Sequence, residues 1–282
     1  MIRLTEAGKK ITFSIHHSPF ITHLHHLPSQ PMTTGLPHDS IMPFNDPDKS
    51  KREQMAEMFD RIARRYDLTN RVLSAGIDIK WRKKAILQLK KDKPREILDV
   101  ATGTCDMAII SYKLLRPEKI TGIDISEQML KLGREKVEKE GLTSVIELQT
   151  GDSETINFAE NSFDAVTVAF GVRNFENLEN GLKEMLRVLR PGGKLVVLEF
   201  SRPRKKIFRS LYNLYMSIVA PEVASWFSQN KKAYQYLNQS ARLFPERQNF
   251  VDILNRTGFS NTSFKPLSAG ICCIYIGEKL VR

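Results

Sequence analysis

No histidine follows His38 in this chain of 282 residues, and all six histidines lie at or before that position. The folded body therefore cannot use a histidine as a general base. Cysteine is also scarce: Cys105, Cys272 and Cys273 form an odd set with no CxxC spacing. This excludes a disulfide scaffold, argues against a zinc site and favours a reducing, cytoplasmic compartment. We expect no metal.

Long hydrophobic runs are missing as well, because no stretch reaches the roughly 18 apolar residues that a membrane-spanning helix needs. Acidic residues are fewer than basic ones, 32 against 43. That excess favours an anionic partner, nucleic acid or lipid head groups, or it reflects only a soluble basic surface. A nucleic-acid-binding module, the alternative from another class, would interleave aromatic and basic residues on an exposed sheet. The strands here are apolar, so we expect no nucleic acid.

Residues 1–45 have no sustained periodicity and are rich in proline, serine, threonine and histidine. We expect a disordered extension there and one folded domain over 46–282. The histidine clusters lack a carboxylate or thiol partner, which argues against a defined metal site. A signal peptide fits poorly, because no adequate apolar segment precedes a small-residue cleavage site. Met42 is an alternative start.

From residue 49 the pattern becomes regular. Apolar residues at helical spacing predict one helix around 55–62 and another around 81–89. Short apolar runs, separated by helical stretches, follow at 96–102, 120–125, 145–152, 163–171 and 194–201. This alternation predicts parallel β-α-β units in a doubly wound sheet with helices on both faces.

The chain ends differently. A helix over 244–259 precedes two predicted strands, 262–267 and 272–280, and the short sequence SAG lies between these strands. So short a connection makes the two strands antiparallel. A mostly parallel, seven-stranded Rossmann-like sheet with an antiparallel last strand is the α/β fold of class I methyltransferases. We expect that fold, with a helical N-terminal cap and a helical insertion.

The segment LDVATGTCD, Leu98 to Asp106, follows the first predicted strand and leads into a helix. A dinucleotide pyrophosphate would need glycines and an uncharged helix N-terminus at this place. Only Gly103 is a glycine among the three alternate positions 101, 103 and 105, and Asp99 and Asp106 put carboxylates near both ends of the loop. This arrangement disfavours a nicotinamide dinucleotide. It suits a ligand with an ammonium and a sulfonium group, such as S-adenosylmethionine.

Two further acids stand at the ends of the second and third strands. Asp124 can accept hydrogen bonds from both ribose hydroxyls of a nucleoside, which NAD and S-adenosylmethionine share. Asp152, with Ser153 beside it, can accept from an adenine amine. Each acid alone could be a turn residue or a helix cap, but three acids at three successive strand ends favour one ligand site.

Four segments together resemble the quinone-biosynthesis C-methyltransferase family: YDLTNRVLSAGIDIKWR at 66–82, DVATGTCD at 99–106, FGVRNF at 170–175 and RVLRPGGKLVVLEFS at 187–201. The resemblance extends from about Lys49 to the C-terminus. It implies S-adenosylmethionine as methyl donor and a polyprenyl naphthoquinol, demethylmenaquinol, as acceptor. The alternative acceptor is a methoxy-polyprenyl-benzoquinol of ubiquinone biosynthesis. Cys105 departs from the usual glycine, and Asp78 stands where some members have histidine.

The resemblance also implies roles for particular residues. Arg173 and Asn174 would face the acceptor, where Arg173 would stabilise a phenolate or position a water. A salt bridge from Arg173 to a strand-end acid is the alternative. Tyr66 would come from the N-terminal cap, unless it only packs. The residues implied to contact or line the cofactor site are Asp99, Gly103, Thr104, Asp124, Asp152 and Ser153.

The segment 203–242 is basic at its start and then carries apolar residues at helical spacing. It predicts either a substrate lid that also docks peripherally on an anionic membrane, at its inner face, or an ordinary packed helical pair. The sequence leaves the oligomeric state open, with a homodimer as one candidate.

Overall fold

The computed structural model describes residues 36–281, apart from 45, 75, 207–209, 211–213 and 215–230. Seven strands form one sheet in the order β3-β2-β1-β4-β5-β7-β6. Strands β1 to β5 pair in parallel, and β7 runs antiparallel to β5 and β6. The strands are β1 (Glu96–Val100), β2 (Lys119–Asp124), β3 (Ile146–Thr150), β4 (Phe163–Ala169), β5 (Leu189–Phe200), β6 (Ser260–Leu267) and β7 (Cys272–Glu278). The predicted fold, including the antiparallel last strand, is confirmed.

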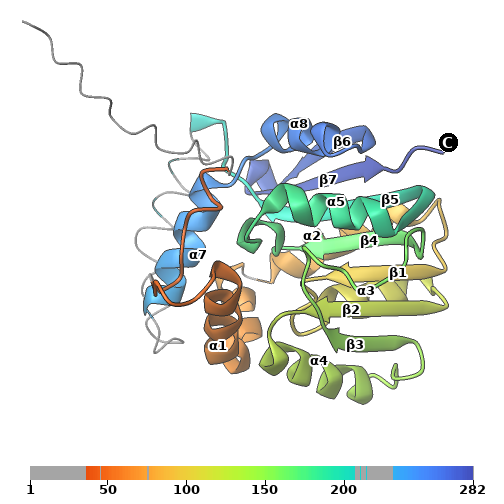
Figure 1. Cartoon of the computed structure of the whole chain (residues 1–282), viewed down its shortest axis with the longest axis horizontal. Helices are drawn as coiled ribbons and strands as arrows, with labels where there is room; N and C mark the ends of the chain where they lie inside the picture. The colour runs from red at the N-terminus through yellow and green to blue at the C-terminus, as the bar shows by residue number, and fades with distance from the viewer. Residues whose placement is uncertain are drawn as a thin grey trace, which may run out of the picture. The chain divides into compact units, whose positions relative to one another are not determined.

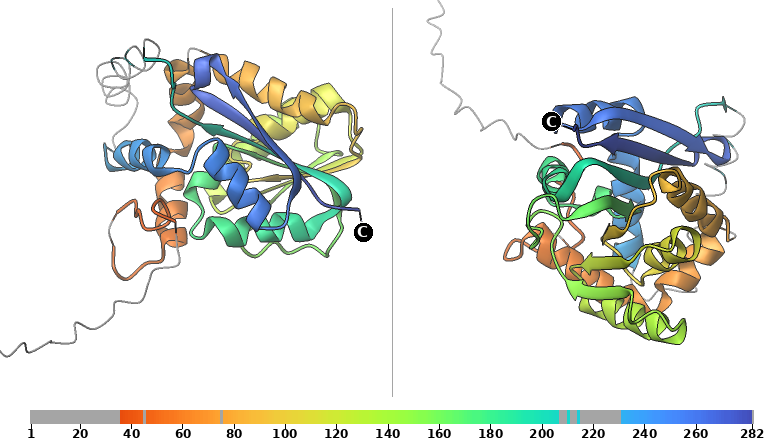
Figure 2. Two further views of the ribbon diagram at one scale, coloured as in Figure 1. Left: turned by 90° about the horizontal axis from the view of Figure 1, so that it is seen from above. Right: turned by 90° about the vertical axis from the view of Figure 1, so that its right-hand side faces the viewer.

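Helices cover both faces of the sheet (Figure 2). Adjacent strand residues face opposite sides: Leu98 packs with Leu182 and Phe250, whereas Ile97 packs with Trp81 and Met107. Strands buried on both faces need continuous apolar runs, which explains the runs in the sequence. The helices are α1 (Lys51–Leu73), α2 (Ile77–Ile86), α3 (Asp106–Leu115), α4 (Glu127–Lys139), α5 (Leu178–Val188), α7 (Lys231–Leu243) and α8 (Gln248–Arg256), with short 3-10 turns η1 (Leu87–Leu89), η2 (Val172–Asn174) and η3 (Ser268–Gly270).

Helices α1 and α7 lie beyond the carboxyl ends of the parallel strands (Figure 1). The apolar face that the sequence predicts for α1 is buried through Met55, Met58 and Ile62. These side chains pack with Tyr236 of α7 and Met129 of α4. The two helices therefore form a cap over the sheet edge where ligands bind in doubly wound folds.

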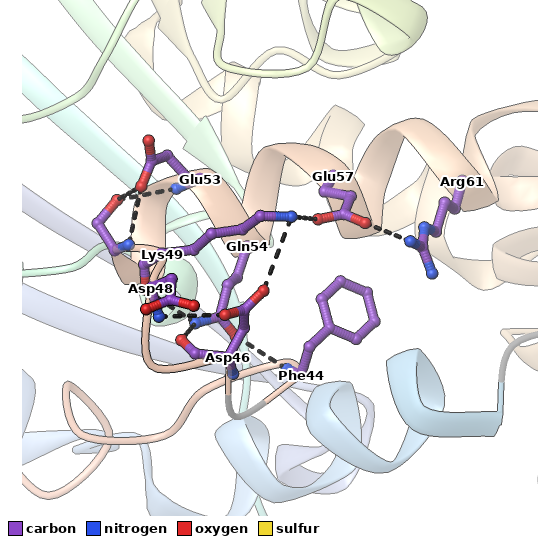
Figure 3. A network of polar contacts seen from close by, with 9 residues as sticks. Phe44, Asp46, Asp48, Lys49, Glu53, Gln54, Glu57 and Arg61 are labelled. Atoms are coloured by element: carbon purple, nitrogen blue, oxygen red, sulfur yellow. Dashed lines mark hydrogen bonds and ion pairs between the residues drawn. The ribbon is translucent and has the colours of Figure 1, made fainter.

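The segment 36–44 packs against the start of α1, which differs from the disordered extension expected up to residue 45. Ile41 is buried, and the Lys51 ammonium donates to the His38 carbonyl at 3.1 Å. The Gln54 side chain accepts from the Phe44 amide at 3.1 Å (Figure 3). Burial of Ile41 supplies the free energy that orders this stretch. Residues 1–35, and most of the expected lid at 203–242, lie outside the described residues; α7 is the described end of that lid.

Candidate active site

The loop after β1 has the backbone shape of a glycine-rich loop, although it contains one glycine. Ala101, Gly103 and Cys105 all have left-handed φ angles, at 51°, 56° and 71°. Glycine adopts this conformation without strain, while alanine and cysteine adopt it at a cost. Cys105 is fully buried, and burial raises the pKa of its thiol, so it stays protonated. A buried, protonated thiol at this position is unreactive.

Asp99, at the end of β1, stabilises this loop through hydrogen bonds on the side of β4. Its carboxylate accepts from the Thr102 and Thr167 hydroxyls, each at 2.6 Å, and only 1% of Asp99 is exposed. Burial raises the pKa of Asp99 to about 6. Asp99 therefore joins β1 to β4 beneath the loop, where it fixes the loop's shape.

The acidic end of the loop at Asp106 is neutralised, which differs from the free carboxylate that the sequence suggests. Arg71 donates to Asp106 at 2.5 Å and Lys136 donates at 2.9 Å. Burial acts to raise the pKa of Asp106, but the nearby cations outweigh it and hold that pKa below its ordinary value. Thr104 belongs to the same cluster, because its hydroxyl donates to Asp67 at 2.6 Å and accepts from Lys136 at 3.0 Å.

A cavity opens beside the loop, at the carboxyl ends of β1 to β4 and under α1. Six of the residues selected from the sequence line it, whereas Asp99, Thr104 and Arg173 lie outside its lining. The cavity therefore brings together groups separated by more than 100 residues in sequence. Its lining residues are Arg52, Phe59, Tyr66, Ala101, Gly103, Asp124, Ile125, Met129, Gly151, Asp152, Ser153, Glu154, Ala169, Phe170, Gly171, Asn174, Phe175 and Glu176.

Asp124 is the central acid of the cavity. Its carboxylate accepts from the amides of Gly103 at 2.8 Å and Ser126 at 2.9 Å. Burial raises the pKa of Asp124 to about 6. Two oxygens with further lone pairs remain at the cavity wall, which suits a ligand that donates hydroxyl hydrogens.

The rim beyond β3 links the sheet to α1. Arg52 of α1 lies 3.1 Å from the Asp152 carboxylate, and its backbone amide donates to Glu176 at 3.3 Å. Ser153 is nearly buried beside Asp152. These contacts close one side of the cavity with the first turn of α1.

Arg173, in η2 after β4, makes the salt bridge that the sequence offered as an alternative. Its guanidinium donates to Glu199 of β5 at 2.5 Å and to the Phe170 carbonyl at 2.8 Å. It also lies over the Phe200 ring, 5.3 Å from the ring centre. Both members of the pair are buried. Burial raises the pKa of Glu199, although Arg173 opposes that rise.

The other two residues selected for the acceptor line the cavity. The Asn174 amide donates to the Phe170 carbonyl at 3.4 Å, and its side-chain oxygen is buried without a hydrogen-bond partner in the described chain. Tyr66 packs edge-on against Phe59 with ring centres 5.9 Å apart. Desolvation raises the pKa of its hydroxyl. Tyr66 therefore packs and lines the cavity at once.

Sequence reasoning missed the apolar walls and the partner of Arg173. Ile125, Met129 and Phe175 form an apolar part of the cavity wall. Ile125 directly follows Asp124, so its place after the second strand was a usable signal. Glu199 was visible as a charge inside the apolar strand KLVVLEFS. A charge in a buried strand needs a partner, and that signal pointed to an ion pair.

A model of the ubiE/COQ5 methyltransferase family matches residues 48–279. The chain belongs to this family. A demethylmenaquinone methyltransferase of Bacteroides fragilis is 46% identical over 245 residues, which cover 87% of this chain and 100% of the relative. A ubiquinone/menaquinone biosynthesis C-methyltransferase UbiE of Geotalea daltonii is 46% identical over 230 residues, 81% of this chain and 97% of the relative. The resemblance found in the four sequence motifs is confirmed.

Solved structures agree on the fold of this methyltransferase. A SAM-dependent methyltransferase of Thermotoga maritima superposes with a TM-score of 0.57 at 18% identity, covering 80% of this chain and 99% of that chain. A SAM-dependent methyltransferase of Methanococcus maripaludis superposes with a TM-score of 0.53 at 18% identity, covering 83% of this chain and 94% of that chain. The protein is an S-adenosylmethionine-dependent methyltransferase.

The cavity fits that methyl donor. It combines a glycine with left-handed φ, a buried carboxylate and apolar walls, a set of groups that could hold a molecule with an amino-acid, a ribose and an adenine part. Among the described residues, no group of three His, Cys, Asp or Glu side chains could hold a metal ion. In the same part of the chain, no helix is long and apolar enough to cross a bilayer.

Cofactor affinity is expected to fall about tenfold between pH 7 and pH 5. In the cofactor-free protein the pKa of Asp124 is about 6, and ribose hydroxyls bind the ionised carboxylate best. The carboxyl group is then protonated in the free protein below pH 6, and binding must displace that proton. Titration calorimetry across this range would measure the effect. Asp124→Asn is the control, and an equal pH dependence in that variant would contradict the assignment to Asp124.

Proposed function

We propose that this methyltransferase converts demethylmenaquinol to menaquinol, the methylation step in menaquinone biosynthesis. The observation that carries the proposal is the 46% identity to the Bacteroides fragilis demethylmenaquinone methyltransferase over that protein's whole length. The site agrees with it, because a buried arginine lies beside the cavity that fits the methyl donor.

We assign the donor side of the cavity to named residues. S-adenosylmethionine supplies a methyl group activated by its sulfonium sulfur. Asp124 accepts from the ribose hydroxyls, and Asp152 with Ser153 binds the adenine amine. Gly103 lets the backbone approach the methionine end, while Asp99 and Thr104 hold the loop in position from behind.

The acceptor side must make a ring carbon nucleophilic. A quinol ring gains electron density at the carbon beside a hydroxyl once that hydroxyl gives its proton to a water positioned by Arg173. That carbon takes the methyl group as the bond from methyl to sulfur breaks, and it then loses its own hydrogen to water as a proton. The Arg173 guanidinium stabilises the resulting oxyanion, and Asn174 and Tyr66 position the ring. Alignment of acceptor carbon and methyl group contributes up to ~7–11 kcal/mol in favourable systems.

A methoxy-polyprenyl-benzoquinol is the second candidate acceptor. The Geotalea daltonii relative, equally similar at 46% identity, carries both ubiquinone and menaquinone biosynthesis in its name. Both acceptors are para-quinols with a free ring carbon beside a hydroxyl. The same arginine and the same cavity would therefore serve either one.

We further propose that the protein acts in the cytoplasm and touches the inner membrane face peripherally. A polyprenyl quinol resides in the bilayer, and the formal net charge of +11 favours anionic lipid surfaces. The basic sequence RPRKK at 202–206 lies at the start of the expected lid. Vesicle flotation with and without anionic lipid tests this contact, and light scattering tests the candidate homodimer.

The activity is tested by an anaerobic assay with labelled S-adenosylmethionine and two reduced acceptors, a short-chain demethylmenaquinol and a methoxy-polyprenyl-benzoquinol. Label in the first alone is the expected result. Label in both acceptors would mean that the enzyme acts in menaquinone and in ubiquinone biosynthesis. If neither is methylated while the methyl donor still binds, the proposed acceptor is wrong and the fold assignment stands.

A further inference from the structure

Four buried polar atoms around Arg173 have no hydrogen-bond partner among the described residues. They are Arg173 Nε, Asn174 Oδ1, Glu199 Oε2 and the Tyr236 hydroxyl oxygen. Nearly all buried polar atoms in proteins are hydrogen-bonded, so unpaired ones at one place need an explanation. A donor, two acceptors and a hydroxyl form a set that a bound hydroxylated ring could satisfy.

Tyr236 comes from α7, the cap helix that contacts η2. Only 2% of Tyr236 is exposed, and its ring packs among Ile41, Met55 and Met58. Phenylalanine would fill this apolar environment equally well. The hydroxyl therefore contributes nothing to packing that the structure reveals.

The surroundings of Tyr236 are continuous with the donor cavity. Met129 belongs to the same apolar cluster as Tyr236, and Phe59, Tyr66 and Ile125 pack against that cluster. All four also line the cavity. Tyr236 thus lies next to residues that line the cavity, and the contact of α7 with η2 brings its helix to the element that carries Arg173.

We propose that the Tyr236 hydroxyl donates a hydrogen bond to the acceptor ring's oxygen, beside the Arg173 guanidinium. This inference rests on the proposed function and adds the Tyr236 hydroxyl to the groups that bind the acceptor. The hydroxyl neither gains nor loses a proton during the reaction. It stabilises the oxyanion whose charge makes the neighbouring ring carbon nucleophilic.

The electrostatics agree with a donor at this position. Burial raises the pKa of Tyr236, and the nearby positive charge of Arg173 only partly opposes that rise. The hydroxyl therefore keeps its hydrogen at neutral pH. An oxyanion beside Arg173 would therefore contact a positive charge from η2 and a neutral hydrogen-bond donor from α7.

The test is Tyr236→Phe, with Tyr275→Phe as matched control. Both tyrosines are buried, but the Tyr275 hydroxyl accepts from the Arg247 amide at 2.8 Å. Tyr236→Phe should keep or raise Tm, keep the Kd for S-adenosylmethionine within twofold, and lower kcat about 10- to 150-fold, as expected for a lost hydrogen bond to a charged group. Tyr275→Phe should lower Tm and keep kcat within twofold.

A second readout separates binding of the oxyanion from a packing role. The acceptor's apparent pKa in the kcat profile should rise by about one to two units in Tyr236→Phe, because the anion loses one donor. Unchanged kcat and an unchanged profile in a folded Tyr236→Phe would overturn the inference alone. If the wild-type enzyme methylates neither quinol, the proposed function fails and this inference fails with it.

Discussion

Replacing Arg173 by methionine is expected to lower kcat about 10²- to 10³-fold and the free energy of unfolding by about 3–5 kcal/mol. The first loss follows from removing the cation beside the acceptor oxygen. The second follows because Glu199 would stay buried without its 2.5 Å partner. Steady-state kinetics and urea denaturation measure the two effects on the same preparation.

A double variant separates the two roles of Arg173. In Arg173→Met with Glu199→Gln, no unpaired buried charge remains, so most of the lost stability should return. Activity should stay low, because the cation is still missing. Recovery of activity along with stability would mean that Arg173 serves only as a salt bridge. Arg173→Lys keeps a charge for Glu199 but loses the contact with the Phe200 ring and the planar donor group, so it is expected to recover only part of the lost stability and to keep a reduced kcat.

Replacing Asp124 by asparagine is expected to raise the Kd for S-adenosylmethionine about 100-fold. Hydrogen bonds to a charged acceptor contribute roughly 1.5–3 kcal/mol each, and the amide keeps only part of that. Tm should fall modestly, because the Gly103 and Ser126 amides donate to different oxygens of Asp124, and an asparagine side chain offers only one acceptor oxygen. Titration calorimetry at pH 7.5 gives the Kd directly.

Asp99→Asn is the control that shows whether the rise in Kd is specific to Asp124. Asp99 is as buried as Asp124 and also has a pKa near 6, but it lies outside the cavity lining. An asparagine there can still hydrogen-bond Thr102 and Thr167, so the loop should hold its shape. Its Kd is expected within about tenfold of wild type. A larger loss for Asp99→Asn than for Asp124→Asn would overturn the division of roles between the two acids.

The sequence by itself determined the fold and the cofactor edge. Continuous apolar runs alternating with helical periods can only be buried in a sheet covered on both faces, and the SAG connection forced the antiparallel end. Asp124 and Asp152 were predicted as site residues because ligands of such folds bind where parallel strands end, and both line the cavity. These features depend on local pattern and chain order, which a sequence contains directly.

The tertiary structure alone decided which charges are paired within the chain. Arg71 and Lys136 neutralise Asp106, Arg52 pairs with Asp152 a hundred residues away, and Glu199 holds Arg173. It also placed Asp99 in contact with Thr102 and Thr167 and outside the cavity lining. Ion pairs between distant elements depend on packing geometry within a few ångströms, because Coulomb and hydrogen-bond energies fall steeply with distance. Residue spacing along a chain does not specify distances of that kind.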